Sequence, residues 1–224
     1  MTRLALYDVS GLLKDMIDKL SGEDCDQWRE ALRRLLRKEN PWPEFGGVWK
    51  TIKLGTGLKN ADDFRKAIKD CGMEIGDWAN DIIGKPEFAV ITKETEETEV
   101  DLVKITVAEL GFKDGAQRDQ IYGRAKELGL ELCPSEVGPQ LRLQYKDQPL
   151  GEWILIAMKP IRGSDGDLNV FNVEHNDSGL WLNSNYGNPG NFWNADNQWV
   201  FVRPRNFLCF SGPVSAGLVS ISNF

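Results

Sequence analysis

The chain has 224 residues, of which 41% are hydrophobic and 27% are charged, and these proportions are typical of a globular protein with its own core. Asp and Glu outnumber Lys and Arg by 34 to 27, which gives a formal net charge of −7. An acidic chain is poorly suited to bind a phosphate backbone, so this composition disfavours general nucleic-acid binding unless a local basic patch overrides it.

The N-terminal residues do not have the pattern of a signal for export. Asp8 interrupts the first apolar run and Lys14 follows soon after, whereas a signal peptide has an uninterrupted apolar core. The sequence also has no run of about 18 uncharged apolar residues, the length that a membrane-spanning helix needs. We therefore expect a cytoplasmic protein with no membrane segment.

The four cysteines are isolated from one another along the chain: Cys25, Cys71, Cys133 and Cys209. The absence of a Cys-x-x-Cys pair argues against a zinc site or a redox motif. In a reducing cytosol we expect free thiols that are mostly buried as small hydrophobic side chains, and a disulfide framework is the alternative.

Apolar residues at helical spacing predict two helices between residues 11 and 38, separated at Ser21-Gly22. Basic residues cover much of the second helix outside its apolar face: Arg29, Arg33, Arg34, Arg37 and Lys38. The favoured interpretation is a solvated charged face, because helix surfaces are commonly charged. A docking face for an acidic partner or nucleic acid is the alternative. Prolines in the stretch 40–47 predict a domain boundary, so residues 1–47 are predicted to be a helical N-terminal region.

Residues 48–135 are predicted to form an α+β middle region. Alternating apolar residues predict strands over 48–54 and 100–107. A helix capped by Asn60 or Asp62 and stopped by Gly72, a short helix over 76–83 and a helix over 116–129 are also predicted. The acidic stretch 93–99 is predicted to be an exposed loop or a continuation of an edge strand.

Residues 136–224 are predicted to be a β-rich region that binds a ligand. The predicted strands cover 141–145, 153–158, 170–173, 179–182 and 198–203. An Asp-Gly step within 164–167 predicts a hairpin turn. The predicted fold class is therefore α+β, with short antiparallel strands in the C-terminal region.

No motif in the sequence assigns a catalytic residue, a metal ligand or a cofactor. His175 is the only histidine, and without a matching nucleophile it predicts no catalytic triad. Asp165, Asp167 and Asn169 alternate as calcium ligands do, but a downstream acidic ligand is missing, so a turn is favoured. Gly55-Thr56-Gly57 lacks the further glycine of a nucleotide-binding loop.

The segment 183–197 is the most unusual part of the sequence, because six of its fifteen residues are Asn and aromatic residues are mixed with them. Asn favours turns, and aromatic side chains provide rigid contact area with a polar group, as in antibody binding loops. We predict a long irregular binding loop; a structural polar loop whose aromatic side chains fill the core is the alternative. The predicted ligand-binding residues are Trp181, Asn183, Asn185, Tyr186, Asn188, Asn191, Phe192, Trp193, Asn194 and Asn197.

This segment, followed by the predicted closing strand Trp199–Arg203, resembles the variable proteins of diversity-generating retroelements. In that family, adenine-directed mutagenesis rewrites asparagine-type codons, and a C-type-lectin-like fold displays the resulting residues to a ligand. The resemblance covers about residues 140–205. It lacks the Gly-Gly-Ser-Trp signature of the commonest subgroup and the glutamate of the sugar-binding lectin motifs, so carbohydrate recognition through Ca²⁺ is not implied.

The sequence and this resemblance together predict a non-enzymatic ligand-binding protein with no cofactor and no bound metal. It is expected to display a variable surface of Asn and aromatic residues on a C-type-lectin-like scaffold and to recognise another protein. The alternative is an enzyme or a nucleic-acid-associated factor that uses the basic helix 29–38 and the acidic cluster 94–101.

Overall fold

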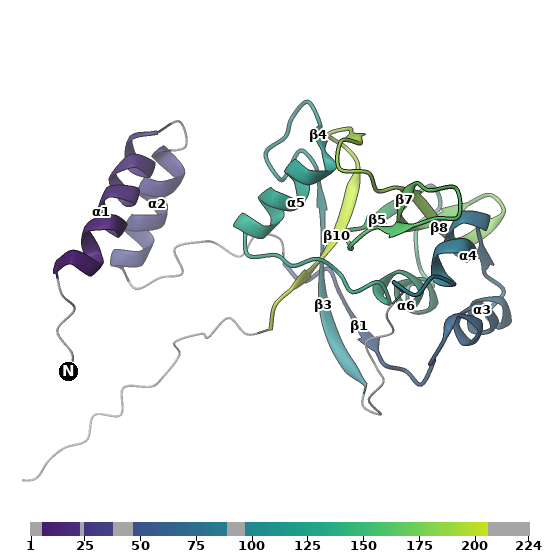
Figure 1. Cartoon of the computed structure of the whole chain (residues 1–224). Helices are drawn as coiled ribbons and strands as arrows, with labels where there is room; N and C mark the ends of the chain where they lie inside the picture. The colour runs from purple at the N-terminus through teal and green to yellow at the C-terminus, as the bar shows by residue number, and fades with distance from the viewer. Residues whose placement is uncertain (1–5, 23–24, 38–46, 89–96, 206–224) are drawn as a thin grey trace, which may run out of the picture. The chain divides into compact units, whose positions relative to one another are not determined.

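The computed structural model describes residues 6–22, 25–37, 47–88 and 97–205, and the chain divides after Gly47 into two compact units. The described part of the first unit is a pair of helices, α1 (Leu6–Ser21) and α2 (Cys25–Leu36) (Figure 1). Ala31 of α2 is buried, and the Lys19 ammonium of α1 lies 4.5 Å from the centroid of the Trp28 ring of α2. These two helices lie where the sequence predicts helices between residues 11 and 38, and α1 begins five residues earlier.

The second unit combines helices and strands, as the predicted α+β class requires. Its helices are α3 (Ala61–Asp70), α4 (Asp77–Ile83), α5 (Arg118–Glu127) and α6 (Val137–Gln144). Its strands are β1 (Lys50–Leu54), β2 (Glu74–Ile75), β3 (Thr98–Thr106), β4 (Ala116–Gln117), β5 (Trp153–Ile156), β6 (Ile161–Arg162), β7 (Leu168–Asn176), β8 (Gly179–Tyr186), β9 (Phe192–Trp193) and β10 (Gln198–Arg203).

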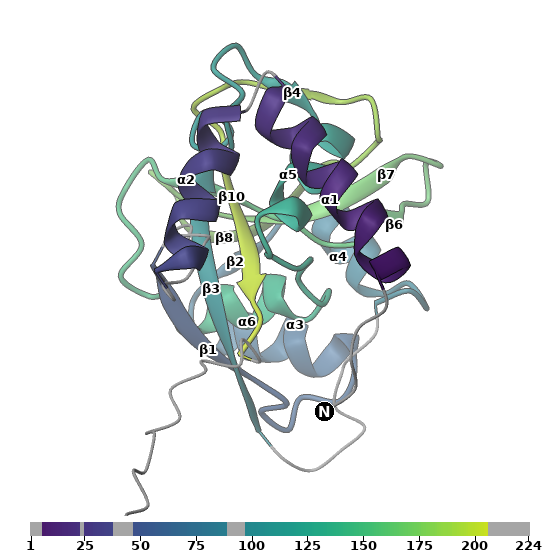
Figure 2. The same cartoon turned by 90° about the vertical axis from the view of Figure 1, so that its left-hand side faces the viewer.

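One mixed sheet organises the second unit. Its strands follow the order β1-β3-β10-β5-β7-β8-β2, with β6 paired to β7, and β4 and β9 form a separate two-stranded sheet. The pairs β10–β5 and β2–β8 are parallel and the other pairs of the sheet are antiparallel. In Figure 2, β1, β3 and β10 can be followed side by side. Strands from the ranges 48–135 and 136–224 pair with one another at two places in this sheet, β3 with β10 and β8 with β2, so the sheet is not divided near residue 135.

The sheet has one face toward α3 and α6 and another toward α5 (Figure 1). On the first face, Phe171 packs so closely on α6 that a Cβ atom at Gly138 would lie 2.6 Å from its ring. On the second face, the α5 face, the Tyr122 ring meets Trp199 and Phe201 edge to face, with centroids 5.6 and 6.1 Å away. Burial of these aromatic side chains supplies much of the hydrophobic stabilisation of the unit.

The local signals for helix ends are confirmed where they could be tested. The side chain of Asn60 accepts hydrogen bonds from the backbone N–H groups of Asp62 and Asp63 at the start of α3, as predicted for an N-cap. Gly84 ends α4 as predicted. The expected hairpin turn also forms, and Gly166 adopts a φ of 93° between β6 and β7, a conformation that glycine accommodates without strain.

Two predictions about the second unit are wrong. Residues 141–145 were predicted as a strand but belong mostly to α6. The prediction read Leu141-Arg142-Leu143 as an alternation of buried and exposed side chains, whereas Arg142 is fully buried. The segment 183–197 is not irregular throughout, because 183–186 belong to β8 and Phe192–Trp193 form β9. Among the described residues, no helix is long and apolar enough to cross a membrane.

Candidate binding surface

A row of polar and aromatic side chains occupies the α5 face where it extends over β5, β7 and β8. Asn172, Glu174 and Asn176 alternate along β7 and therefore share one face of the sheet. Trp181 and Asn183 of β8 lie opposite Glu174 and Asn172, and this register places them on that same face. We call the set Trp153, Asn172, Glu174, Asn176, Trp181, Asn183 and Asn185 the β7–β8 surface.

Glu174 lies between two tryptophans in this surface. Trp153 of β5 and Trp181 of β8 are its cross-strand partners on either side. Neighbouring strands are about 4.8 Å apart, so the two tryptophan Cα atoms are about 10 Å apart with the carboxylate between them. All three side chains are half-buried. The arrangement is a negative charge flanked by two electron-rich rings.

Hydrogen bonds hold the Glu174 carboxylate and the Trp181 ring in place. Glu174 Oε1 accepts a hydrogen bond of 2.8 Å from Asn176 Nδ2. Asn176 Oδ1 in turn accepts from Ser178 Oγ at 2.6 Å, and Ser178 Oγ accepts from Trp181 Nε1 at 3.0 Å. The ionised carboxylate keeps acceptor capacity, because within the described residues it forms no ion pair.

The buried Asn172 lies beside Glu174 and is only partly satisfied. Its Nδ2 atom is 3.5 Å from Glu174 Oε2, at the limit of a hydrogen bond, and its buried Oδ1 atom has no hydrogen-bond partner in the described part of the chain. A buried amide oxygen without a partner is costly, about 1–3 kcal/mol. The indole nitrogens of the core residues Trp193 and Trp199 also have no partner among the described residues, so this feature alone does not mark a binding site.

The ten residues predicted to bind a ligand occupy different environments. Trp181, Asn183 and Asn185 belong to the β7–β8 surface, although the Asn183 amide is directed at Gly76, where a Cβ atom would lie 1.8 Å from Asn183 Oδ1. Tyr186 and Phe192 are exposed by 54% and 61%.

The other asparagines of the segment stabilise its backbone. Asn191 Nδ2 donates to Tyr186 O at 3.3 Å, and the Asn191 carbonyl accepts from Arg118 N at 2.9 Å. Asn197 Oδ1 accepts from Asn194 N at 2.8 Å, which closes a short turn. The Asn188 carbonyl accepts from Asn191 N at 3.0 Å. The side-chain contacts of Asn191 and Asn197 fit the alternative interpretation, a structural polar loop, whereas Asn188 and Asn194 take part through their backbone only.

Trp193 is part of the core and closes one side of the β7–β8 surface. It is only 6% exposed, and its ring lies 5.2 Å from Trp199 and 6.1 Å from Trp153, measured between centroids. The pairing of Ala116 with Trp193 in the β4–β9 sheet fixes its backbone. The Trp193 ring therefore packs against Trp153 of the β7–β8 surface and is itself too buried to offer much contact area to a ligand.

Four residues of the β7–β8 surface were not among the predicted ligand-binding residues: Trp153, Asn172, Glu174 and Asn176. The alternation Asn172-x-Glu174-x-Asn176 within a strand was available as a signal of a polar face. No sequence signal indicated the contribution of Trp153, because its place beside Glu174 depends on the order and register of strands that are distant in sequence.

The other candidate groups of the sequence have structural partners. His175 Nδ1 lies 2.6 Å from the carbonyl oxygen of Gln148. Asp165 accepts a hydrogen bond from Asp167 N as part of the turn, and no group of three metal-ligating side chains occurs within the described ranges. Burial raises the pKa of the Cys133 thiol, whose Sγ donates to Val200 O, so this cysteine is a poor nucleophile.

The acidic cluster and the basic helix of the alternative hypothesis lie in different units. Of the acidic residues, Glu97 pairs with Lys53 at 2.8 Å, and Glu99 and Asp101 pair with Arg205. Glu94 and Glu96 lie outside the described residues, as do Lys38 of the basic helix and Cys209. The described acidic side chains are thus held by surface ion pairs on β1, β3 and the end of β10.

Comparison with known proteins gives no relative: no family model matches the chain, and neither the curated proteins nor the solved structures contain a match. The functional argument therefore depends on the geometry of the surface itself.

Proposed function

We propose that the second unit is a non-enzymatic binding domain that recognises another protein through the β7–β8 surface, and that a basic side chain of that protein sits on Glu174 between Trp153 and Trp181. The observation that carries the proposal is the cross-strand row Trp153–Glu174–Trp181. Its carboxylate is half-buried and forms no ion pair with another described residue.

The chemistry of the row fits an arginine or a lysine. A carboxylate attracts the cation, and the faces of tryptophan rings attract it further by about 0.5–2 kcal/mol. Tryptophan also provides a large contact area at a small cost in conformational entropy, which is why it is enriched among the residues that dominate protein interfaces. The chain's net charge of −7 favours association with a basic partner.

The finer proposal is that the domain is a C-type-lectin-like scaffold whose segment 183–197 is diversified by a retroelement. Its support is the composition of that segment. If it is correct, change should concentrate at exposed positions such as Tyr186, Phe192 and Asn194 and spare the buried Gly187 and Trp193. The gene tests this directly: a near-copy of its 3′ end beside a reverse transcriptase gene is expected, and its absence would remove this part of the proposal.

The proposed cation site can be tested without knowing the partner. We would follow the indole N–H signals of Trp153 and Trp181 by NMR during titration with acetyl-arginine amide, and repeat the titration with acetyl-citrulline amide, which is uncharged and almost isosteric. The expected result is a saturable shift of both signals with arginine and a much weaker one with citrulline. Equal responses to the two compounds would contradict the proposal.

A matched pair of variants identifies the carboxylate. Glu174→Gln removes the charge while keeping the size, and should abolish the preference for arginine over citrulline. Asp196→Asn removes one exposed negative charge elsewhere, and should leave that preference unchanged. If both variants lose the preference equally, the arginine responds to the net charge of the domain and the proposed site is wrong.

A further inference from the structure

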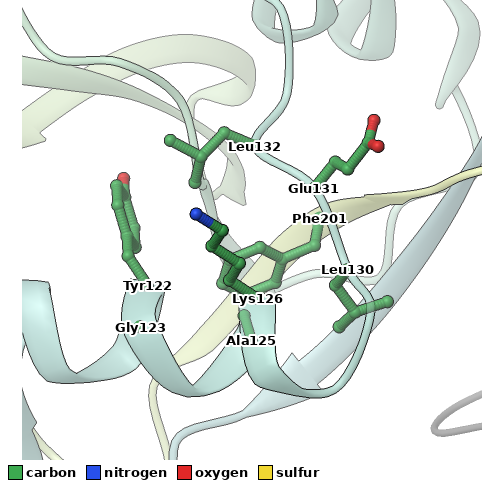
Figure 3. A pocket seen from close by; sticks show the side chains of 8 residues that line it. All are labelled: Tyr122, Gly123, Ala125, Lys126, Leu130, Glu131, Leu132 and Phe201. Atoms are coloured by element: carbon green, nitrogen blue, oxygen red, sulfur yellow. The ribbon is translucent and has the colours of Figure 1, made fainter. Parts of the chain in front are cut away.

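A second candidate site lies beside α5, and none of its lining residues belongs to the β7–β8 surface. It is a hollow of about 360 Å³ formed by α5, the segment 130–132 and β10 (Figure 3). The lining residues are Tyr122, Gly123, Ala125, Lys126, Leu130, Glu131, Leu132 and Phe201. Its volume is within the range of small-molecule pockets, about 300–1,000 Å³.

Backbone hydrogen bonds fix the walls of this hollow. Leu130 N donates to Ala125 O at 3.0 Å, which folds the chain back against the end of α5. Glu131 then forms two backbone hydrogen bonds of 2.9 Å with Val202 of β10. The hollow is therefore preformed, and a ligand would bind without ordering the chain first.

The walls are almost entirely apolar. The ring of Phe201 forms the floor and Leu132, which is 42% exposed, forms one rim. The Tyr122 hydroxyl donates to the carbonyl oxygen of Met158 at 3.1 Å, and burial raises the pKa of this tyrosine, so it stays neutral and is already engaged. The walls of the hollow thus offer few hydrogen-bonding groups, and they suit the apolar part of a ligand.

One charge is directed into the hollow. In Figure 3 the Lys126 ammonium points between the Tyr122 ring and Leu132, whereas the Glu131 carboxylate points away. Within the described residues Lys126 forms no ion pair, and the nearby Glu127 is paired with Arg124 at 3.0 Å. A cation beside an apolar wall is complementary to a ligand with an apolar body and a single negative charge.

The geometry points to this hollow as a binding site for a small apolar anion, such as an aromatic or aliphatic carboxylate or sulfonate. The apolar body would cover Phe201 and Leu132, and the acidic group would pair with Lys126. Binding at this hollow requires neither the β7–β8 surface nor a protein partner.

The test uses two fluorescent probes that differ in charge: anilinonaphthalene sulfonate, an aromatic anion, and phenylnaphthylamine, its uncharged counterpart. The full-length protein should bind the sulfonate saturably at one site per chain under native conditions. Lys126→Met should weaken sulfonate binding about two- to fivefold, the range expected for an exposed ion pair, and leave the uncharged probe nearly unaffected. Lys113→Met, which removes an exposed lysine outside the hollow, is the matched control.

A second variant tests the location. Leu132→Asp places a carboxylate on an exposed rim position, and should reduce binding of both probes more than tenfold while the urea unfolding midpoint stays close to that of the wild type. Failure of the sulfonate to bind, binding that survives Leu132→Asp, or an unchanged ratio of the two affinities in Lys126→Met would each overturn the inference.

Discussion

The indole of Trp193 meets the indole of Trp199 at an interplanar angle of 87°, with ring centroids 5.2 Å apart. Trp193 comes from β9 of the Asn-rich segment and Trp199 from the closing strand β10, so this contact packs β9 onto the sheet, to which residues 183–186 already belong as part of β8. Within the segment, Trp193 is thus buried in the core, whereas Tyr186 and Phe192 are exposed and within reach of a ligand.

The neighbours Phe192 and Trp193 should respond very differently to truncation. Trp193→Ala empties a core position and should lower the free energy of unfolding by about 3–5 kcal/mol. Phe192 is 61% exposed, so Phe192→Ala should change the same quantity by less than about 0.5 kcal/mol. Urea unfolding of both variants measures this. Equal losses would show that the exposed ring of Phe192 also packs in solution.

Gly76 and Asn183 should be energetically coupled. A methyl group at position 76 would lie 1.8 Å from Asn183 Oδ1, so Gly76→Ala should displace that amide and destabilise the domain by about 1 kcal/mol. In an Asn183→Ala background the obstruction is gone, and the same change should be close to neutral. A double-mutant cycle measured by urea unfolding would give this coupling directly, and additive effects would contradict the contact.

Asp81 should make stability depend on pH in the acidic range. Hydrogen bonds from Ser164 and a nearby Lys85 lower the pKa of Asp81 from 3.8 to about 2. A pKa lowered by folding means that the ionised form stabilises the native state; this contribution is complete above pH 3.8 and is lost as the pH falls through about 2.

The corresponding experiment compares the wild type with Asp81→Asn at a series of pH values. The variant should unfold more easily at pH 7, and the difference should shrink steadily below pH 4 because the wild-type carboxyl also becomes neutral. Asp196→Asn, which removes one exposed negative charge elsewhere, controls for general charge effects. A difference that stays constant down to pH 2 would mean that the Asp81–Ser164 hydrogen bonds do not stabilise the fold.

Arg142 should be essential for packing despite its charge. Its guanidinium is fully buried and donates to Gln148 Oε1 at 2.5 Å, to Glu174 O at 3.2 Å and to Tyr145 O, and burial lowers its pKa to about 10. Arg142→Met keeps most of the volume and leaves these acceptors unpaired, which should cost about 2–4 kcal/mol.

The exposed Arg162 offers a control for this substitution. Arg162→Met removes one exposed hydrogen bond, from Arg162 to the Gly166 carbonyl, and should change the free energy of unfolding by no more than about 1 kcal/mol. Chemical denaturation at pH 7 compares the two variants. If Arg142→Met proved as stable as Arg162→Met, the buried hydrogen bonds would contribute no net stability.

The sequence by itself determined the elements whose signals are local. The helix pair of the first unit follows from apolar spacing, the start of α3 from the capping side chain of Asn60, and the β6–β7 turn from the Asp-Gly step at Asp165-Gly166. Each of these depends on interactions among residues a few positions apart, so a window of sequence contains the whole cause.

Only the tertiary structure decided which side chains share a surface. Arg142 is polar but buried, because its two terminal nitrogens donate to Gln148, Tyr145 and Glu174, the last of which lies on β7, although its Nε has no partner among the described residues. Trp193 is in the core because Trp199 lies beneath it, and Glu174 stands between Trp153 and Trp181 because three strands pair in one register. Strand order and register are set by packing over the whole sheet, and no local pattern encodes them.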